Sequence, residues 1–276
     1  YSLIDWRPVN IDEAFFLQNV YRMADGERPF VDFYESRVPL AHALMIPAFG
    51  LLAEPWRAYA ATRYINLAIV IVNSILFFAF ISRYFGWLPA LFGLALWNSF
   101  DYYVWRPDFR LNNPMHLFLL PAIWLLLEGM VKQRRLLSAM SGFFVGCAIL
   151  TKQPALLLFF GMFASVFLYH LFSGKSGWLR SALYDLFVFG GASLLSFWLL
   201  FALILGGQVI EGFTLMFQTY GLFSLLEQFG QYTERYPTCL RDTLVPNCFQ
   251  WFVLVASVLY ANYLVFGRRR VYAPLL

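Results

Sequence analysis

The sequence predicts an all-α fold: a polytopic bundle of about seven or eight transmembrane helices, with juxtamembrane amphipathic helices in its first external loop. Of its 276 residues 61% are hydrophobic, 20% are aromatic and only 13% are charged, and the mean hydropathy is +0.62. Soluble domains contain roughly 25% charged residues and cannot bury so much apolar surface. Several apolar runs also approach the roughly 20 residues that cross a bilayer.

The domain organisation follows from where the apolar runs stop. We expect a piece of a longer chain, because the sequence begins with Tyr1 instead of methionine and ends inside an apolar run. Within this piece we expect one transmembrane domain over residues 1–276. Its expected parts are an external loop at 1–58, a transmembrane core at 59–206, a second external loop at 207–245 and further spans at 246–276.

The first external loop is expected to contain two surface elements. Phe16, Val20 and Met23 recur at helical spacing, which predicts an amphipathic helix from Asp12 to about Ala24, ended by the following Asp-Gly pair. The apolar stretch after residue 37 is interrupted by two prolines and a glycine and is short for a crossing, so an interfacial helix is expected there.

The core is expected to consist of consecutive spans joined by short turns. The turn "TKQ" leaves room only for a tight helical hairpin. The expected spans are 59–82, 88–105, 114–131, 136–150, 154–172, 181–205 and 246–266, with another beginning near Tyr272.

The short turns indicate how the chain is oriented. Alternate turns carry basic residues, and by the positive-inside rule these turns are cytoplasmic. The residues are Arg83, Lys132, Arg134, Arg135, Lys175, Arg180, Arg268, Arg269 and Arg270. The opposite face then holds most of the acids. The net charge of +4 is explained by these turns, so no nucleic-acid partner is implied. Cys239 and Cys248 flank a loop on the external face, where a disulfide is one alternative.

Two sets of acids on the external face are candidate functional residues. Asp12 and Glu13 begin the expected surface helix, where acids interact favourably with the helix dipole, and such a capping role does not exclude catalysis. Asp108 lies in a short loop beside Arg106 and Arg110. It is either a solvated, neutralised acid or a residue that lines a polar cavity between spans.

Lys152 is the candidate cation. It occupies the "TKQ" turn between two apolar runs, where a lysine could simply extend to the interface. A lysine at the headgroup level also suits a phosphate ligand. The three histidines are scattered through the sequence and do not have the spacing of a metal site.

These motifs resemble one known family in their order and in their shared membrane side. The resembling segments are "IDEAFFLQNVYRMADGERPFVDFYESRVPLAHALMIPAFGLL", "RYINLAIVIVNSILFFAFISRYFG", "WRPDFRLNNP" and "AILTKQPALL". They are similar to the polyprenyl-phosphate-sugar-dependent glycosyltransferases of the C superfamily, in particular protein O-mannosyltransferases and bacterial aminoarabinose transferases. The resemblance covers roughly residues 11–175, and the family's expected first span and C-terminal soluble domain are not visible.

The resemblance implies an inverting transfer of a sugar from a polyprenyl or dolichyl phosphate to a hydroxyl of a lipid, glycan or protein acceptor. Asp12 would be the base or the acceptor-binding acid, and it is favoured over Asp108 as the base because it begins an ordered helix. Glu13 and Asp108 would orient the acceptor or hold a divalent cation. Lys152, with Arg106, would stabilise the departing phosphate. No cofactor is required, although Asp12 and Asp108 could hold a divalent cation such as Mg²⁺ or Mn²⁺. The implied location is a bacterial cytoplasmic membrane, with the site facing outward among membrane lipids.

Two other classes of function remain open at the level of sequence. A transporter would use the external-face acids and Lys152 as a polar path, but the sequence has no internal repeat and no paired broken helices of the kind that such folds use. In a non-catalytic scaffold the charged loops would be solvated connections only. The substitution Asp12→Asn distinguishes a scaffold from an enzyme, because in a scaffold it would leave cellular glycans unchanged.

Overall fold

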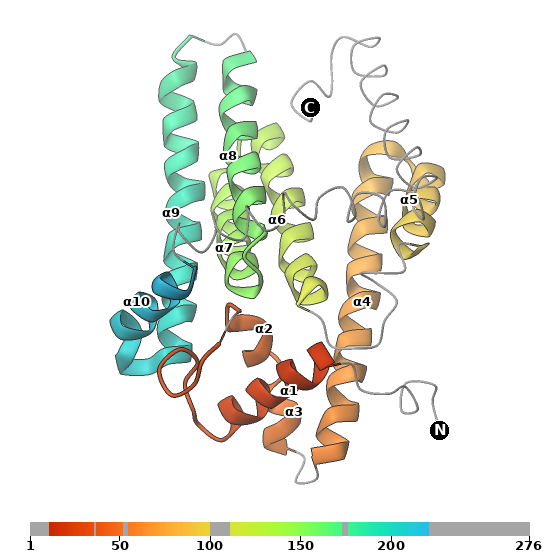
Figure 1. The fold of residues 1–276 in the computed structure, drawn as a ribbon. Coiled ribbons are helices and arrows are strands. Elements are labelled where there is room, and N and C mark those ends of the chain that lie inside the picture. The colour runs from red at the N-terminus through yellow and green to blue at the C-terminus, as the bar shows by residue number, and fades with distance from the viewer. Residues whose placement is uncertain (1–10, 36, 52–54, 100–110, 173–175, 221–276) are drawn as a thin grey trace, which may run out of the picture. The chain divides into compact units, whose positions relative to one another are not determined.

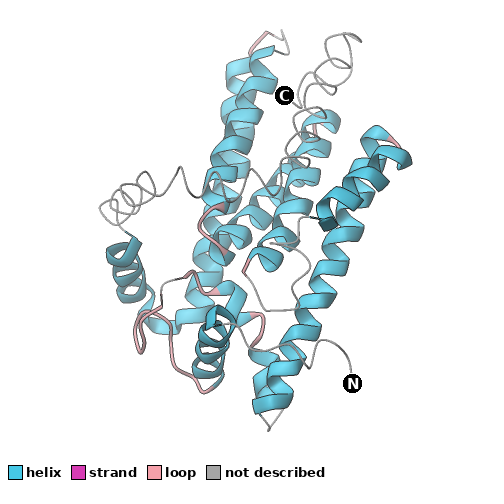
Figure 2. Cartoon of the chain, turned by 45° about the vertical axis from the view of Figure 1, so that its right-hand side comes forward, coloured by secondary structure: helices cyan, strands magenta, loops and turns pink. Residues whose placement is uncertain are grey.

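The computed structural model describes residues 11–35, 37–51, 55–99, 111–172 and 176–220. The chain divides into two compact units, Tyr1–Val209 and Ile210–Leu276. All of the regular elements in the described residues are helices, which confirms the all-α prediction (Figure 1, Figure 2). They are α1 Ile11–Ala24, α2 Leu40–Ala43, α3 Ile46–Leu51, α4 Pro55–Phe85, α5 Trp87–Ser99, α6 Asn112–Lys132, α7 Arg135–Thr151, α8 Ala155–Phe172, α9 Trp178–Leu205, the 3₁₀ turn η1 Gly206–Gln208 and α10 Val209–Tyr220.

Fewer helices than expected are long and apolar enough to cross a membrane. Within the described residues there are four such runs, which are Trp56–Phe85, Asn112–Lys132, Ala155–Phe172 and Trp178–Phe217. The expected span at 136–150 is the helix α7, which has only 17 residues. The expected span at 88–105 is described only through α5, which has 13 residues. The spans expected at 246–266 and from Tyr272, and both external-loop cysteines, lie outside the described residues.

The helices expected within residues 1–58 are present in the structure. The helix α1 covers the predicted segment and ends before Gly26, whose φ of +92° reverses the chain. The predicted interfacial helix is split into the short helices α2 and α3. Further along the chain, the beginning of the second predicted external loop contains η1 and α10.

Close packing of α7 against α6 and α9 forms the centre of the bundle. A Cβ atom added to Gly142 would lie 2.1 Å from the carbonyl oxygen of Phe189, and one added to Gly146 would lie 1.9 Å from Ser196 Oγ. The two backbones therefore approach as closely as small residues allow in a membrane bundle. On the other side, Ser141 Oγ donates a 2.7 Å hydrogen bond to the carbonyl of Ala122 on α6.

The hairpin between α7 and α8 is as tight as the "TKQ" turn predicts. The helix α7 ends at Thr151, Lys152 is extended with φ −160° and ψ 134°, and α8 begins at Ala155. In the first unit this turn lies at the same end as α1, α2, α3 and the beginnings of α4 and α6 (Figure 1). Two of the predicted functional segments, the first turn of α1 and the "TKQ" turn, thus lie at one end of the first unit.

Candidate functional site

An apolar core fixes the surface helix α1 to the ends of the long helices. Leu17 and Val20 of α1 are buried together with Met45, Tyr59 of α4 and Leu111 at the beginning of α6. The apolar positions of α1 recur three and four residues apart, so they form the stripe that an amphipathic helix buries. This packing places the first turn of α1 beside α4.

Glu13 is buried in an ion pair between α1 and α4. Its side chain is 1% exposed, and that of Arg63 is fully buried. Arg63 donates from Nε to Oε1 at 3.0 Å and from a terminal nitrogen to Oε2 at 2.7 Å, and the Tyr59 hydroxyl donates to Oε2 at 2.9 Å. The guanidinium also lies over the Tyr59 ring, 4.5 Å from its centroid. This bidentate geometry holds the carboxylate of Glu13 in one orientation.

The sequence reasoning missed Arg63. It lies inside the segment 59–82 that was predicted simply as a span. The signal that could have found it is an arginine in the first turns of an apolar helix, because such a charge needs a buried partner. Glu13 is the acid that meets this need.

A second buried polar group lies under the middle of α1. Asn19 Nδ2 donates to Glu35 Oε2 at 2.6 Å, and the backbone N–H of Arg37 donates to Glu35 Oε1 at 2.8 Å. His42 Nε2 lies 3.7 Å from Glu35 Oε2, and both side chains are fully buried. Burial lowers the pKa of His42 to about 3, with a further contribution from the charge of Arg37. His42 is therefore neutral at pH 7.

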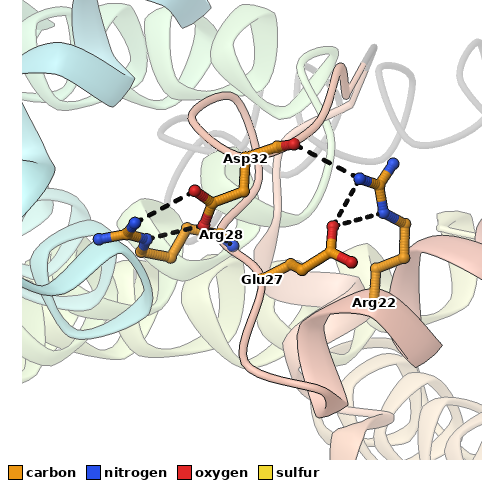
Figure 3. Close-up of polar contacts among 4 residues, drawn as sticks. All are labelled: Arg22, Glu27, Arg28 and Asp32. Atoms are coloured by element: carbon orange, nitrogen blue, oxygen red, sulfur yellow. Dashed lines mark hydrogen bonds and ion pairs between the residues drawn. The ribbon is translucent and has the colours of Figure 1, made fainter.

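Two ion pairs stabilise the loop that follows α1 (Figure 3). Arg22 pairs with Glu27 at 2.5 Å and lies over the ring of Phe33, while Arg28 pairs with Asp32 at 2.8 Å. Arg22 also donates to the backbone oxygen of Asp32 at 3.4 Å. Hydrogen bonds from the Arg28 side chain and backbone lower the pKa of Asp32 below its usual value. These contacts order the loop that leads from α1 to α2.

Lys152 lies in a polar layer with the first residues of α6. Its Nζ donates to Asn112 Oδ1. Asn112 is 8% exposed and Asn113 is 2% exposed, and Asn113 Nδ2 donates to Asn66 Oδ1 of α4 at 3.1 Å. The side chain of Lys152 is half-buried, so its charge lies at the edge of the layer. The sequence reasoning identified Lys152 but not the asparagines, which looked like the end of a loop.

The other predicted site residues are placed only in part. Asp12 belongs to the first turn of α1, but its side chain is outside the described set. Asp108 and Arg106 lie in the segment 100–110, which is also outside it. A cavity shared by Asp12, Asp108 and Lys152 therefore stays a prediction. Among the described residues, no group of three histidine, cysteine or acidic side chains could hold a metal ion.

The fold and the site define a class of protein, a helical membrane protein with buried charged and amide side chains at one end of its helices. Residues 38–203, more than half of the chain, match the family model of dolichyl-phosphate-mannose-protein mannosyltransferases, and the chain belongs to this family. It is thus a membrane glycosyltransferase of the class that uses polyprenyl-phosphate sugars, which confirms the resemblance noted from the sequence.

The matched segment contains Arg63, Arg106, Asp108 and Lys152, whereas α1 precedes it. Among curated proteins and among solved structures, no match was found.

Proposed function

We propose that the protein transfers a sugar from a polyprenyl phosphate to a hydroxyl acceptor with inversion, at the non-cytoplasmic face of the membrane. The observation that carries the proposal is the position of Lys152. It is half-buried, and the turn between α7 and α8 that contains it lies at the same end of the first unit as α1 (Figure 1). The short basic turns support the orientation.

In the proposed reaction the acceptor oxygen attacks the anomeric carbon from the side opposite the phosphate. The new carbon–oxygen bond forms as the bond to the phosphate oxygen breaks, and the phosphate leaves with the bonding electrons. Asp12 accepts the proton of the acceptor hydroxyl. Lys152, with Arg106, stabilises the charge on the departing lipid phosphate. A phosphate is a good leaving group at neutral pH, so no general acid is needed.

The contacts of Glu13 support a positioning role for this acid. Both of its oxygens accept hydrogen bonds from Arg63 or Tyr59. We propose that it fixes the first turn of α1 and so positions Asp12, while Asp108 orients the acceptor. A divalent cation at Asp12 and Asp108 remains a proposal and is tested by measuring transfer with and without a chelator.

Transfer of labelled sugars from polyprenyl phosphates by purified full-length protein tests the reaction. Asp12→Asn should abolish transfer and leave donor binding intact, with the exposed Asp25→Asn, just after the opposite end of α1, as control. Lys152→Ala should weaken donor binding, whereas Lys132→Ala, at the other end of α6, should not. Full transfer by Asp12→Asn would remove that residue as the base. If no lipid phosphate bound at all, the transporter would become the better explanation.

The membrane face is tested separately. In a background without the native cysteines, a cysteine replacing Asp25 should react with an impermeant reagent added outside sealed right-side-out vesicles. Reaction only after the vesicles are opened would place the site on the cytoplasmic face.

A further inference from the structure

Three polar atoms between α4, α5 and α6 are sealed from solvent. They are Asn73 Oδ1 of α4, Trp97 Nε1 of α5 and His116 Nδ1 of α6, and none has a hydrogen-bond partner in the described part of the chain. Buried polar atoms are nearly always hydrogen-bonded, because an unpaired one loses its interaction with water and gains nothing in return. Three such atoms on neighbouring helices point to a shared partner.

The contacts around these atoms place them in one layer of the bundle. Asn73 Nδ2 donates to the backbone oxygen of Asn113 at 2.9 Å, and His116 is one helical turn further along α6. The ring of Trp97 lies 5.0 Å from the ring of His116, centroid to centroid, in a T-shaped arrangement. On α4, Phe77 is one turn beyond Asn73 and stacks on Trp97 at 5.0 Å.

The hydrogen-bonding capacity of the three atoms matches one small molecule. The indole N–H of Trp97 can only donate, the amide oxygen of Asn73 can only accept, and Nδ1 of a neutral His116 accepts when the proton is on Nε2. We propose that one internal water molecule binds here, accepting from Trp97 and donating to Asn73 and His116. Three hydrogen bonds are typical of a buried water. The burial of all three atoms excludes a bulky ligand such as a sugar ring.

The water would extend the polar layer that begins at Lys152. Lys152 donates a hydrogen bond to the side chain of Asn112. The side chain of the next residue, Asn113, donates to Asn66, and its backbone oxygen accepts from Asn73. The proposed water continues this layer between the helices. A hydrated, hydrogen-bonded layer lowers the cost of keeping the charge of Lys152 partly buried.

Hydroxyl-radical labelling of the full-length protein in nanodiscs tests the proposal, because X-rays generate radicals from internal waters as well as from bulk water. Trp97 should be oxidised, although its indole nitrogen is sealed from solvent. Replacing both Asn73 and His116 by leucine should lower the oxidation rate of Trp97 several-fold. The control is Asn98→Leu, which removes a neighbouring amide that accepts from Ser74 instead. An unchanged rate in the double variant would overturn the proposal.

A second measurement does not depend on that double variant. If the water is bound, Trp97→Phe removes one of its hydrogen bonds, and the melting temperature should fall further than in Trp124→Phe, which corrects for the smaller ring. If the site is dry, Trp97→Phe removes an unpaired donor. The melting temperature would then be higher than in Trp124→Phe, and this result would refute the proposal.

Discussion

The ion pair between Glu13 and Arg63 gives the sharpest test of how α1 is held. Glu13→Gln keeps the shape of the side chain but removes the carboxylate charge that pairs with the buried guanidinium of Arg63. Three hydrogen bonds to the carboxylate, at 2.7, 2.9 and 3.0 Å, lose strength together. Removing one partner of a buried pair costs about 3–5 kcal/mol. Since each 1.4 kcal/mol is tenfold, the docked state of α1 should become less populated by a factor of roughly 100 to 4,000.

Hydrogen exchange measured by mass spectrometry on the peptide covering α1 is the appropriate assay. The helix can open locally while the long helices stay folded, so its amides report the docking free energy directly. Protection of α1 should fall in Glu13→Gln and in Arg63→Met, and sugar transfer should fall with it.

The double variant Glu13→Met with Arg63→Met separates the ion pair from simple side-chain loss. It removes both charges of the pair together and should recover most of the protection, because neither charge is buried without the other. Exchange of α1 that is unchanged in Glu13→Gln would refute the reasoning. If α1 exchanged as fast in the double variant as in either single variant, packing and not charge would be what holds the helix.

Three further predictions concern packing and pH. Gly146→Ala should destabilise the protein by about 1–3 kcal/mol in a denaturation assay, because the new Cβ would lie 1.9 Å from Ser196 Oγ, whereas Gly161→Ala, with nothing within 4 Å, should not. His42 binds a proton in the unfolded chain from its ordinary pKa of 6.5 but in the folded protein only near 3, so stability should fall by up to about 1.4 kcal/mol per pH unit as the pH drops below 6.5. His42→Phe should flatten that slope. The pKa of Asp32 is lowered from 3.8 in the folded protein, so the ionised carboxylate stabilises the fold above pH 3.8. This stabilisation is lost as the pH falls through the lowered pKa of the folded protein, and a pH series of denaturation curves should show that Asp32→Asn removes this loss.

The spacing of apolar residues was sufficient to predict the helices, but not to predict how many of them are long and apolar enough to span a membrane. The predicted surface helix and the hairpin at "TKQ" are both present, because a local pattern of apolar and polar residues decides them. The helix α7 shows what the pattern omits. It is short for a span, and one side of it packs against α6 and α9 through Ser141, Gly142 and Gly146. Composition alone does not distinguish this surface from one that faces lipid.

Partners distant in the sequence were the part that could not be predicted. Glu13 meets Arg63 across 50 residues, and Lys152 meets Asn112 across 40. Each pairing depends on how helices dock, and a single sequence carries no record of docking. The residue types were still informative, since a buried arginine or lysine must find an acceptor. Sequence reasoning could therefore name Lys152 as important without naming the side chain that holds it.

The adjacent acids at the beginning of α1 can have different roles, one structural and one catalytic. Consecutive positions on an α-helix face directions about 100° apart, so one acid can be docked without requiring the other to be docked. Glu13 is buried in its contacts with Arg63 and Tyr59. The buried acid gives the first turn a fixed position, which a catalytic carboxylate needs to within a fraction of an ångström. If Asp12 is the base, weakening the Glu13–Arg63 pair should therefore lower the rate of transfer without removing any group that touches the substrate.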